Sequence, residues 1–217
     1  MTAIHPLGEG AWTVVLGDRV ERDLARRVRH LAERVRAAEL PGVWEVVPAY
    51  AALTVYFDPR TGDAGAIRDA LARWADTESR GGPPPDRVPP ALPVVIPVHY
   101  DGPDLAEVAA RTGLTRDEVI RRHAAPTYEV YLLGFAPGFA YLGELDPALV
   151  LPRRSSPRPR IPAGSVAIAG AQTAVYPLET PGGWNLIGRT ATVMFDPRRT
   201  PPVLLAPGDR VRFEVLP

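Results

Sequence analysis

Proline is distributed very unevenly along this 217-residue chain, with 4 of its 26 prolines in residues 1–80 and 22 in residues 81–217. The change of composition falls at Gly81 to Pro90, which reads GGPPPDRVPP. Neither a helix nor a central strand can continue through such a segment, because proline fixes φ and lacks the backbone N–H. We therefore predict a stiff linker at residues 81–92 that separates a domain of residues 1–80 from one of residues 93–217.

The first part alternates between strand and helix patterns. Short strands are predicted at residues 12–16, 43–47 and 53–57. A helix beginning at Asp18 and a second helix are indicated by apolar residues at helical spacing, which are Val20, Leu24, Val28, Leu31 and Val35 in the first and Ile67, Leu71 and Trp74 in the second. This β-α-β-β-α order is typical of a ferredoxin-like α/β domain. A further predicted strand, residues 93–100, could belong to either domain.

The second part begins with two short helices, at residues 104–111 and from Thr115 onward, and then becomes β-rich. Short β runs separated by Gly and Pro turns are predicted at residues 128–133, 166–168, 174–178, 191–195 and 211–215. Several short strands with dense turn signals favour a closed barrel or a sandwich. The fold class expected for the whole chain is therefore α+β.

The composition excludes several kinds of chemistry. The 25 basic and 25 acidic residues balance, which argues against a nucleic-acid or membrane partner. All basic residues are arginine, so a Walker-type phosphate loop and Schiff-base catalysis are excluded. The absence of cysteine and of any close histidine pair predicts no protein-bound metal. No signal peptide or membrane span is recognisable, so we expect a cytoplasmic protein.

Unusual side chains concentrate between His123 and Arg189, although none of them can be assigned as catalytic. They comprise neutral polar groups, forked cations suited to a carboxylate or phosphate, and flat aromatic rings, a mixture that a small-molecule pocket or partner surface requires. These candidates are His123, Gln172, Tyr176, Asn185, Arg158, Arg160, Arg189, Phe135, Phe139, Tyr141 and Trp184. Structural alternatives remain open for each: solvated arginines, packed rings, barrel-interior polar groups, or a core histidine. The loop YLLGFAPGFAYLG (131–143) either presents its rings as a pre-organised surface or plugs the barrel end.

Six motifs occur in order along the second part. They are HAAPTY (123–128), LLGFAPGFAYL (132–142), LDP (145–147), PRPRIPAGSVAIAG (157–170), QTAVYP (172–177) and PGGWNLIGRT (181–190). Together with GDRV (17–20), LPGV (40–43) and VVPAY (46–50), they closely resemble the family that contains the B-type component of 5-oxoprolinase, the KipI kinase inhibitor and proteins labelled allophanate hydrolase subunit 1. The resemblance implies a C-terminal cyclophilin-like β-barrel after the ferredoxin-like domain.

The resemblance also implies a function. The expected role is a non-autonomous component of an ATP-dependent amidohydrolase that converts 5-oxo-L-proline (pyroglutamate) to L-glutamate. The implied partners are a KipA-type (C-type) component and a LamB/YcsF-type (A-type) component, and ATP, with Mg²⁺ accompanying it, would be used by the complex. The alternative is a KipI-like protein that inhibits a sensor histidine kinase. A carboxyltransferase component of a urea-processing enzyme and a prolyl isomerase are further readings, the last on barrel shape alone.

Overall fold

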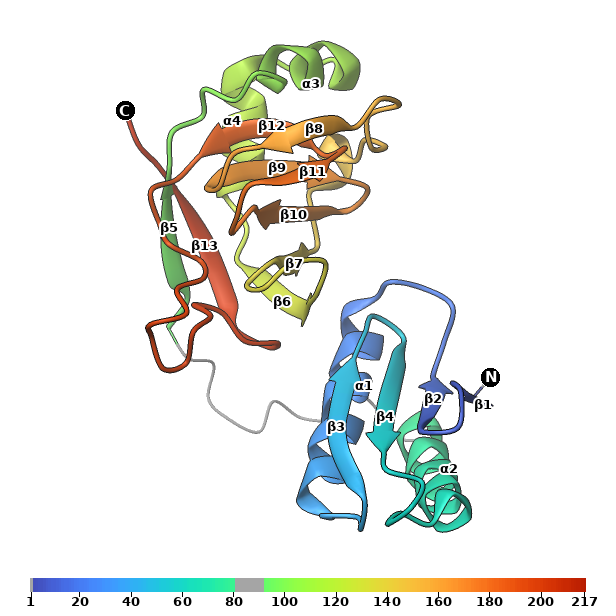
Figure 1. Ribbon diagram of the computed structural model, residues 1–217. Coiled ribbons are helices and arrows are strands. Elements are labelled where there is room, and N and C mark those ends of the chain that lie inside the picture. The colour runs from blue at the N-terminus through green and yellow to red at the C-terminus, as the bar shows by residue number, and fades with distance from the viewer. Residues whose placement is uncertain (1, 81–91) are drawn as a thin grey trace. The chain divides into compact units, whose positions relative to one another are not determined.

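A computed structural model describes residues 2–80 and 92–217 (Figure 1). The chain divides into two compact units, Met1–Pro89 and Pro90–Pro217. Of the predicted linker at residues 81–92, residues 81–91 lie outside the described part of the chain. Within the described residues, no helix is both long enough and apolar enough to cross a membrane.

The first unit is a four-stranded antiparallel sheet with two helices, and its sheet order is β1-β2-β4-β3. Its elements are β1 (Ala3–Pro6), β2 (Ala11–Val15), α1 (Arg22–Ala37), β3 (Val43–Pro48), β4 (Ala52–Phe57) and α2 (Ala64–Arg80). The predicted β-α-β-β-α order runs from β2 to α2. The N-terminal strand β1, which the sequence patterns did not indicate, adds to the free edge of β2.

Helix α1 packs its apolar stripe on this sheet but starts later than predicted. It begins at Arg22, with Glu21 as the N-cap and no side-chain capping bond, so the predicted start at Asp18 is wrong. The stripe explains the difference, because Val20 is 51% exposed whereas Val28 and Leu31 are fully buried. The buried contacts that stabilise the helix therefore begin one turn after Val20.

The second unit is built on a seven-stranded sheet of order β12-β9-β10-β7-β6-β13-β5, accompanied by the two-stranded sheet β11-β8. Its elements are β5 (Val94–Val98), α3 (Leu105–Thr112), α4 (Arg116–Ala124), β6 (Tyr128–Leu133), β7 (Ala140–Gly143), the 3-10 turn η1 (Pro147–Leu149), β8 (Arg158–Ile161), β9 (Ser165–Ala169), β10 (Gln172–Val175), β11 (Thr180–Gly182), β12 (Asn185–Arg189) and β13 (Arg210–Val215). The predicted strand at residues 93–100 thus belongs here, as β5, where it runs parallel to β13.

The large sheet curves until its two edge strands meet, which makes it a nearly closed barrel (Figure 1). Just after β5, the His99 N–H donates to the Arg189 carbonyl at 2.9 Å, and the Arg189 N–H donates to the His99 carbonyl at 2.8 Å. This pair of bonds joins β5 to β12. The chain is therefore a mixed α/β protein with a nearly closed β-barrel sheet.

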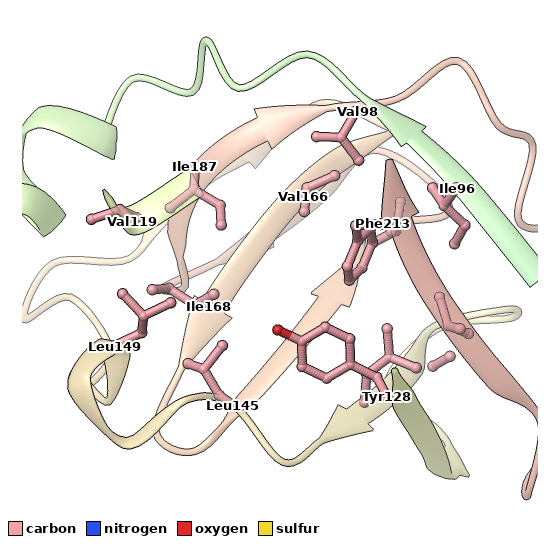
Figure 2. Close-up of a cluster of buried hydrophobic side chains, with 14 of the residues drawn as sticks. Ile96, Val98, Val119, Tyr128, Leu145, Leu149, Val166, Ile168, Ile187 and Phe213 are labelled. Carbon is pink, nitrogen blue, oxygen red and sulfur yellow. The ribbon is translucent and has the colours of Figure 1, made fainter. Parts of the chain in front are cut away.

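Alternating side chains of the barrel strands fill its interior (Figure 2). Val166 and Ile168 of β9 point into this core together with Ile187 of β12. Tyr128 of β6 and Phe213 of β13 face one another there, with ring centroids 5.6 Å apart. Because side chains of a strand alternate between its faces, the residues between these core positions point to the outside of the barrel.

Some strand predictions fail for identifiable reasons. The predicted strand at residues 191–195 is absent, because that segment has no strand ladder and its one β-pairing is an isolated bridge, Phe195 to Val203. The strands β7, β8, β11 and β12 were not predicted. They are three to five residues long and contain glycine or proline, so pairing with neighbouring strands, not their own composition, maintains them.

Candidate functional site

The outer face of the barrel carries a second apolar cluster, which we call the aromatic layer. Its floor consists of the small side chains Ala167 and Ala169 of β9 and Ala174 of β10. The rings of Phe139, Tyr141, Tyr176 and Trp184 pack over this floor, and Ile161 of β8 closes one side. A floor of alanines leaves room for large rings to lie close to the strands, so the layer is packed like a core although it lies outside the barrel.

Phe139 is at the centre of the layer. Its ring centroid is 4.9 Å from that of Tyr141, 5.2 Å from Tyr176 and 5.7 Å from Trp184, and the last two contacts are edge-to-face. Tyr141 and Trp184 also meet edge-to-face at 5.9 Å. These separations are those at which aromatic pairs attract beyond simple burial. The four rings therefore form one rigid platform.

Phe135 extends this platform into solvent. Its side chain is 61% exposed, and its ring meets Phe139 at 5.3 Å and Tyr176 at 6.5 Å. Its backbone is in the left-handed region, with φ of 68°, which is uncommon for a residue with a side chain. Gly138 (φ 80°) fixes the same loop against Met194 and Phe195. The loop thus holds an apolar ring in solvent at the cost of local strain, as binding sites often do.

Tyr176 is a buried member of the layer, with 1% of its surface exposed. Burial raises the pKa of Tyr176 to about 12, although the backbone N–H of Trp184 donates to the phenol oxygen and acts to lower the pKa. Burial also raises the pKa of Tyr141. Gly182 has no room for a side chain, because a Cβ there would lie 2.5 Å from the Tyr176 hydroxyl. Tyr176 is therefore a fixed, protonated phenol at neutral pH.

Asp104 organises the cations beside this layer. Its carboxylate, 4% exposed, accepts two bonds from Arg158 (2.9 and 2.6 Å) and one from Arg154 (2.9 Å). It also accepts the backbone N–H of Leu186 in β12 at 2.7 Å. One buried carboxylate thus joins the start of α3 to β8 and β12. Both terminal nitrogens of Arg158, a predicted ligand residue, are thus already bonded to this carboxylate.

The other two predicted arginines lie apart from one another. Arg160 is 81% exposed and pairs with Glu179 at 3.5 Å, at the β8-β11 sheet. Arg189, at the end of β12, is 67% exposed and pairs with Asp101 at 2.8 Å. Such exposed pairs contribute little to stability. The structure therefore does not gather Arg158, Arg160 and Arg189 into one anion site.

His123 lies inside the barrel core, on the opposite side of the sheet from the aromatic layer. Its Nδ1 lies 2.7 Å from the Tyr100 hydroxyl, and its Nε2 lies 2.8 Å from Thr173 Oγ1. Since Thr173 Oγ1 donates its single proton to the Ala167 carbonyl (3.0 Å), Nε2 is the donor to Thr173 and Nδ1 accepts from Tyr100. Burial lowers the pKa of His123 to about 3, so the ring is neutral.

The remaining polar candidates are also placed by the strands. Asn185 begins β12, is 1% exposed, and donates through Nδ2 to the carbonyls of Pro152 and Ile168 at 3.2 Å. No partner for its Oδ1 is found among residues 2–80 and 92–217. Gln172 begins β10, where it pairs with Ala169. Both residues lie at strand ends, and alternation along β10 places Gln172 on the same face as Ala174.

The structure thus brings five predicted residues together, namely Phe135, Phe139, Tyr141, Tyr176 and Trp184. Sequence reasoning missed Asp104, which it treated only as a helix start, and Arg153, whose charge lowers the pKa of Tyr141 and of Tyr176. No local pattern distinguishes Arg153 from its neighbours. In the described part of the chain, no group of three His, Asp or Glu side chains lies close enough to hold a metal ion.

Comparison with known proteins gives a consistent result. The family described as "Carboxyltransferase domain, subdomain C and D" matches residues 2–205. A protein of Escherichia coli O157:H7 named as the B component of 5-oxoprolinase is 44% identical over 211 residues, covering 95% of this chain and 93% of the relative. Its namesake in Bacillus subtilis (strain 168) is 41% identical over 227 residues, covering 97% and 91%.

Solved structures agree with the fold. TTHA0988 is 45% identical with a TM-score of 0.83, and the match covers 95% of this chain and 40% of that one. The chain therefore spans well under half the length of TTHA0988. A conserved uncharacterized protein from Pyrococcus horikoshii is 39% identical with a TM-score of 0.56, covering 99% and 97%. The Kluyveromyces lactis urea carboxylase is 17% identical with a TM-score of 0.74, and the match covers 100% of this chain and 22% of that one. At this identity the likeness shows only that the two share a fold.

Proposed function

Because the chain belongs to the carboxyltransferase domain, subdomain C and D, family, we propose that it is the B-type component of an ATP-dependent 5-oxoprolinase. The complex would convert 5-oxo-L-proline to L-glutamate with a LamB/YcsF-type component and a KipA-type component. The observation that carries this proposal is 44% and 41% identity, over more than 90% of each sequence, to two proteins with that name. Within this proposal, residues 1–80 form the ferredoxin-like domain and residues 93–217 the cyclophilin-like barrel, joined by the linker at residues 81–92.

The chemistry explains why several proteins would be needed. The lactam of 5-oxoproline is a stabilised amide, and phosphorylation of its oxygen by ATP would turn it into an electrophile that water can attack. This chain has no lysine and no phosphate loop, so the proposal assigns ATP and its Mg²⁺ to a site completed by the partners. TTHA0988 supports such an arrangement, since a module like this one occupies only 40% of that longer chain.

The part assigned to this chain is recognition. The aromatic layer presents an exposed ring, Phe135, on a rigid platform whose floor is fixed by β9 and β10. A rigid apolar surface loses little entropy when a ligand or partner covers it, which favours binding. The chain therefore supplies one wall of a composite site, and the bond-breaking groups come from the other components.

Reconstitution tests the proposal. The chain is mixed with the LamB/YcsF-type and KipA-type proteins of its own cell, and 5-oxoproline-dependent ATP hydrolysis and glutamate release are measured. Activity that requires all three proteins, and that falls to background when this chain is omitted, is the expected result. Full activity without the chain, or no activity with the complete set alongside a positive Escherichia coli control complex, would refute it.

A carboxyltransferase role is the second candidate, favoured by the description of the matching family. The same three-protein mixture, supplied with a carboxylated biotin donor and urea, separates the two functions. Carboxyl transfer without 5-oxoproline-dependent ATP hydrolysis would favour this second candidate. Inhibition of a sensor histidine kinase stays a prediction of the family resemblance.

A further inference from the structure

The segment before β8 runs beside the aromatic layer and is fixed at two points. The Leu151 carbonyl accepts the Gly170 N–H at 2.7 Å, and the Arg154 N–H donates to the Gly183 carbonyl at 2.7 Å. Arg153 lies between these two anchors, directly before Arg154. The residue that Arg154 bonds to, Gly183, directly precedes Trp184. The backbone of Arg153 is therefore held at the rim of the aromatic layer.

Arg153 differs from the other cations of this region. Arg154 and Arg158 are bound to Asp104, whereas Arg153 is exposed and has no ion pair with any described residue. Its charge is close enough to lower the pKa of both Tyr141 and Tyr176. The guanidinium thus lies near the two phenols with no carboxylate to neutralise it, and this corner of the layer carries an excess of positive charge.

Tyr176 contributes a hydrogen-bond donor to the same corner. Its oxygen accepts the backbone N–H of Trp184, and its own O–H is a donor. The residue as a whole is 1% exposed, and a ligand or water that accepts this O–H would stabilise it. Since burial keeps the phenol protonated at neutral pH, the O–H is available to bond an anionic oxygen.

We propose that Arg153 and Tyr176 bind the carboxylate of a small cyclic amide whose flat ring lies against the aromatic layer beside Trp184 and Phe135. This inference rests on the proposed function and identifies the residues that would recognise 5-oxoproline. A guanidinium with an O–H donor suits a carboxylate, and an apolar platform suits a five-membered ring better than a hydrated phosphate. Arg153 is here a specificity residue and takes no part in breaking the amide bond.

Steady-state kinetics of the three-protein complex test this role. Loss of a charge-assisted bond to the carboxylate is expected to raise the KM for 5-oxoproline by about 10- to 100-fold in Arg153→Gln, with kcat little changed. Tyr176→Phe keeps the ring and is expected to raise KM by about 3- to 10-fold, as for a neutral hydrogen bond. The control is Arg116→Gln, which removes another exposed arginine, at the start of α4, and is expected to leave KM unchanged.

Two further measurements identify the bound group. Inhibition by 2-pyrrolidinone, which has the ring without the carboxylate, is expected to be equal in wild type and Arg153→Gln. The KM for ATP is also expected to be unchanged, and a rise in it instead would mean that Arg153 binds a nucleotide phosphate and would overturn the inference. So would a KM for 5-oxoproline within about twofold of wild type in Arg153→Gln.

Failure of this inference is distinguishable from failure of the proposed function. If the wild-type complex turns over 5-oxoproline but Arg153→Gln behaves as wild type, only the inference fails. If the wild-type complex is inactive, the proposed function fails, and NMR titration of the isolated chain with 5-oxoproline decides the inference. Binding that Arg153→Gln weakens supports it, and equal binding or none overturns it.

Discussion

The buried, neutral histidine predicts how the stability of the barrel depends on pH. His123 is fully buried, with the hydroxyls of Tyr100 and Thr173 on its two nitrogens and the rings of Tyr128 and Phe213 beside it. Its pKa falls from 6.5 to about 3 on folding, because burial disfavours the charged ring. Burial raises the pKa of Tyr100 and of Tyr128, so both phenols stay protonated throughout the acidic and neutral range.

The sign follows from proton linkage. Below pH 6.5 the unfolded chain takes up a proton at His123 that the folded chain does not, so the free energy of unfolding falls as the pH falls. The stabilisation from the neutral ring is complete above pH 6.5 and is lost progressively toward pH 3. With about 1.4 kcal/mol per pKa unit, the loss is about 2 kcal/mol at pH 5 and about 3 kcal/mol at pH 4.

The assay is urea unfolding between about pH 4 and pH 8, read by the fluorescence of Trp184, the tryptophan of the barrel unit. Trp12, Trp44 and Trp74 of the first unit are replaced by Phe in this background. The side chain in His123→Gln is neutral at every pH, so position 123 no longer contributes to the pH dependence of the free energy of unfolding. The difference in this free energy between the parent and His123→Gln is therefore expected to shrink by about 3 kcal/mol from pH 7 to pH 4.

The control and the refuting result are defined by the same experiment. His5→Gln, an exposed histidine on β1 of the first unit, is expected to leave the barrel's pH profile unchanged. Parallel profiles for the parent and His123→Gln, with a constant difference across the acidic range, would show that His123 is not the buried neutral group inferred here.

Four other variants test the structural reasoning. Asp104→Ala leaves two guanidiniums and a buried strand N–H without their carboxylate, so a loss of about 3–5 kcal/mol is expected in urea unfolding, and a loss below about 1 kcal/mol would contradict the role of Asp104. Gly102→Ala places a Cβ against the backbone of β12, so a loss of at least about 1–3 kcal/mol is expected by the same measurement. Phe135→Asn accepts the left-handed backbone, so the melting temperature is expected to hold or rise while the KM for 5-oxoproline rises, and an unchanged KM would remove Phe135 from the binding surface. Arg36→Ala uncovers the Val46 carbonyl on the edge strand β3, so light scattering is expected to show more self-association than for an exposed arginine of α2 such as Arg73→Ala.

Sequence patterns were sufficient where a feature is local. Apolar residues recur at helical spacing in α1 and alternate with polar residues in β13, so spacing alone reveals these two elements. The ordered motifs predicted family membership, because they sample most of the chain. The aromatic candidates also share one surface, since they come from motifs that neighbouring strands bring together.

Patterns failed where the deciding partner is distant in the chain. Asp104 meets Arg158 across 54 positions, and His123 meets Thr173 across 50. The sequence near Arg158 does not indicate that its guanidinium is bound to a carboxylate. The sequence near Arg153 likewise does not indicate that its guanidinium has no carboxylate partner among the described residues. Only the three-dimensional structure therefore separates cations that stabilise the fold from a cation that is available to a ligand.

This separation also explains the division of labour that the proposed function requires. One face of β9 and β10 covers a packed interior that contains the neutral His123. On the other face, small alanines support buried rings on which the exposed ring of Phe135 rests. The histidine, which elsewhere would be the natural general base, is protonated too weakly and buried too deeply to exchange protons with a substrate. The face with the aromatic layer offers the exposed ring of Phe135 and the exposed cation Arg153, which in the proposed role would bind and orient a carboxylate but would not abstract a proton. This arrangement agrees with the proposed function, in which the chain recognises substrate and its partners supply the reacting groups.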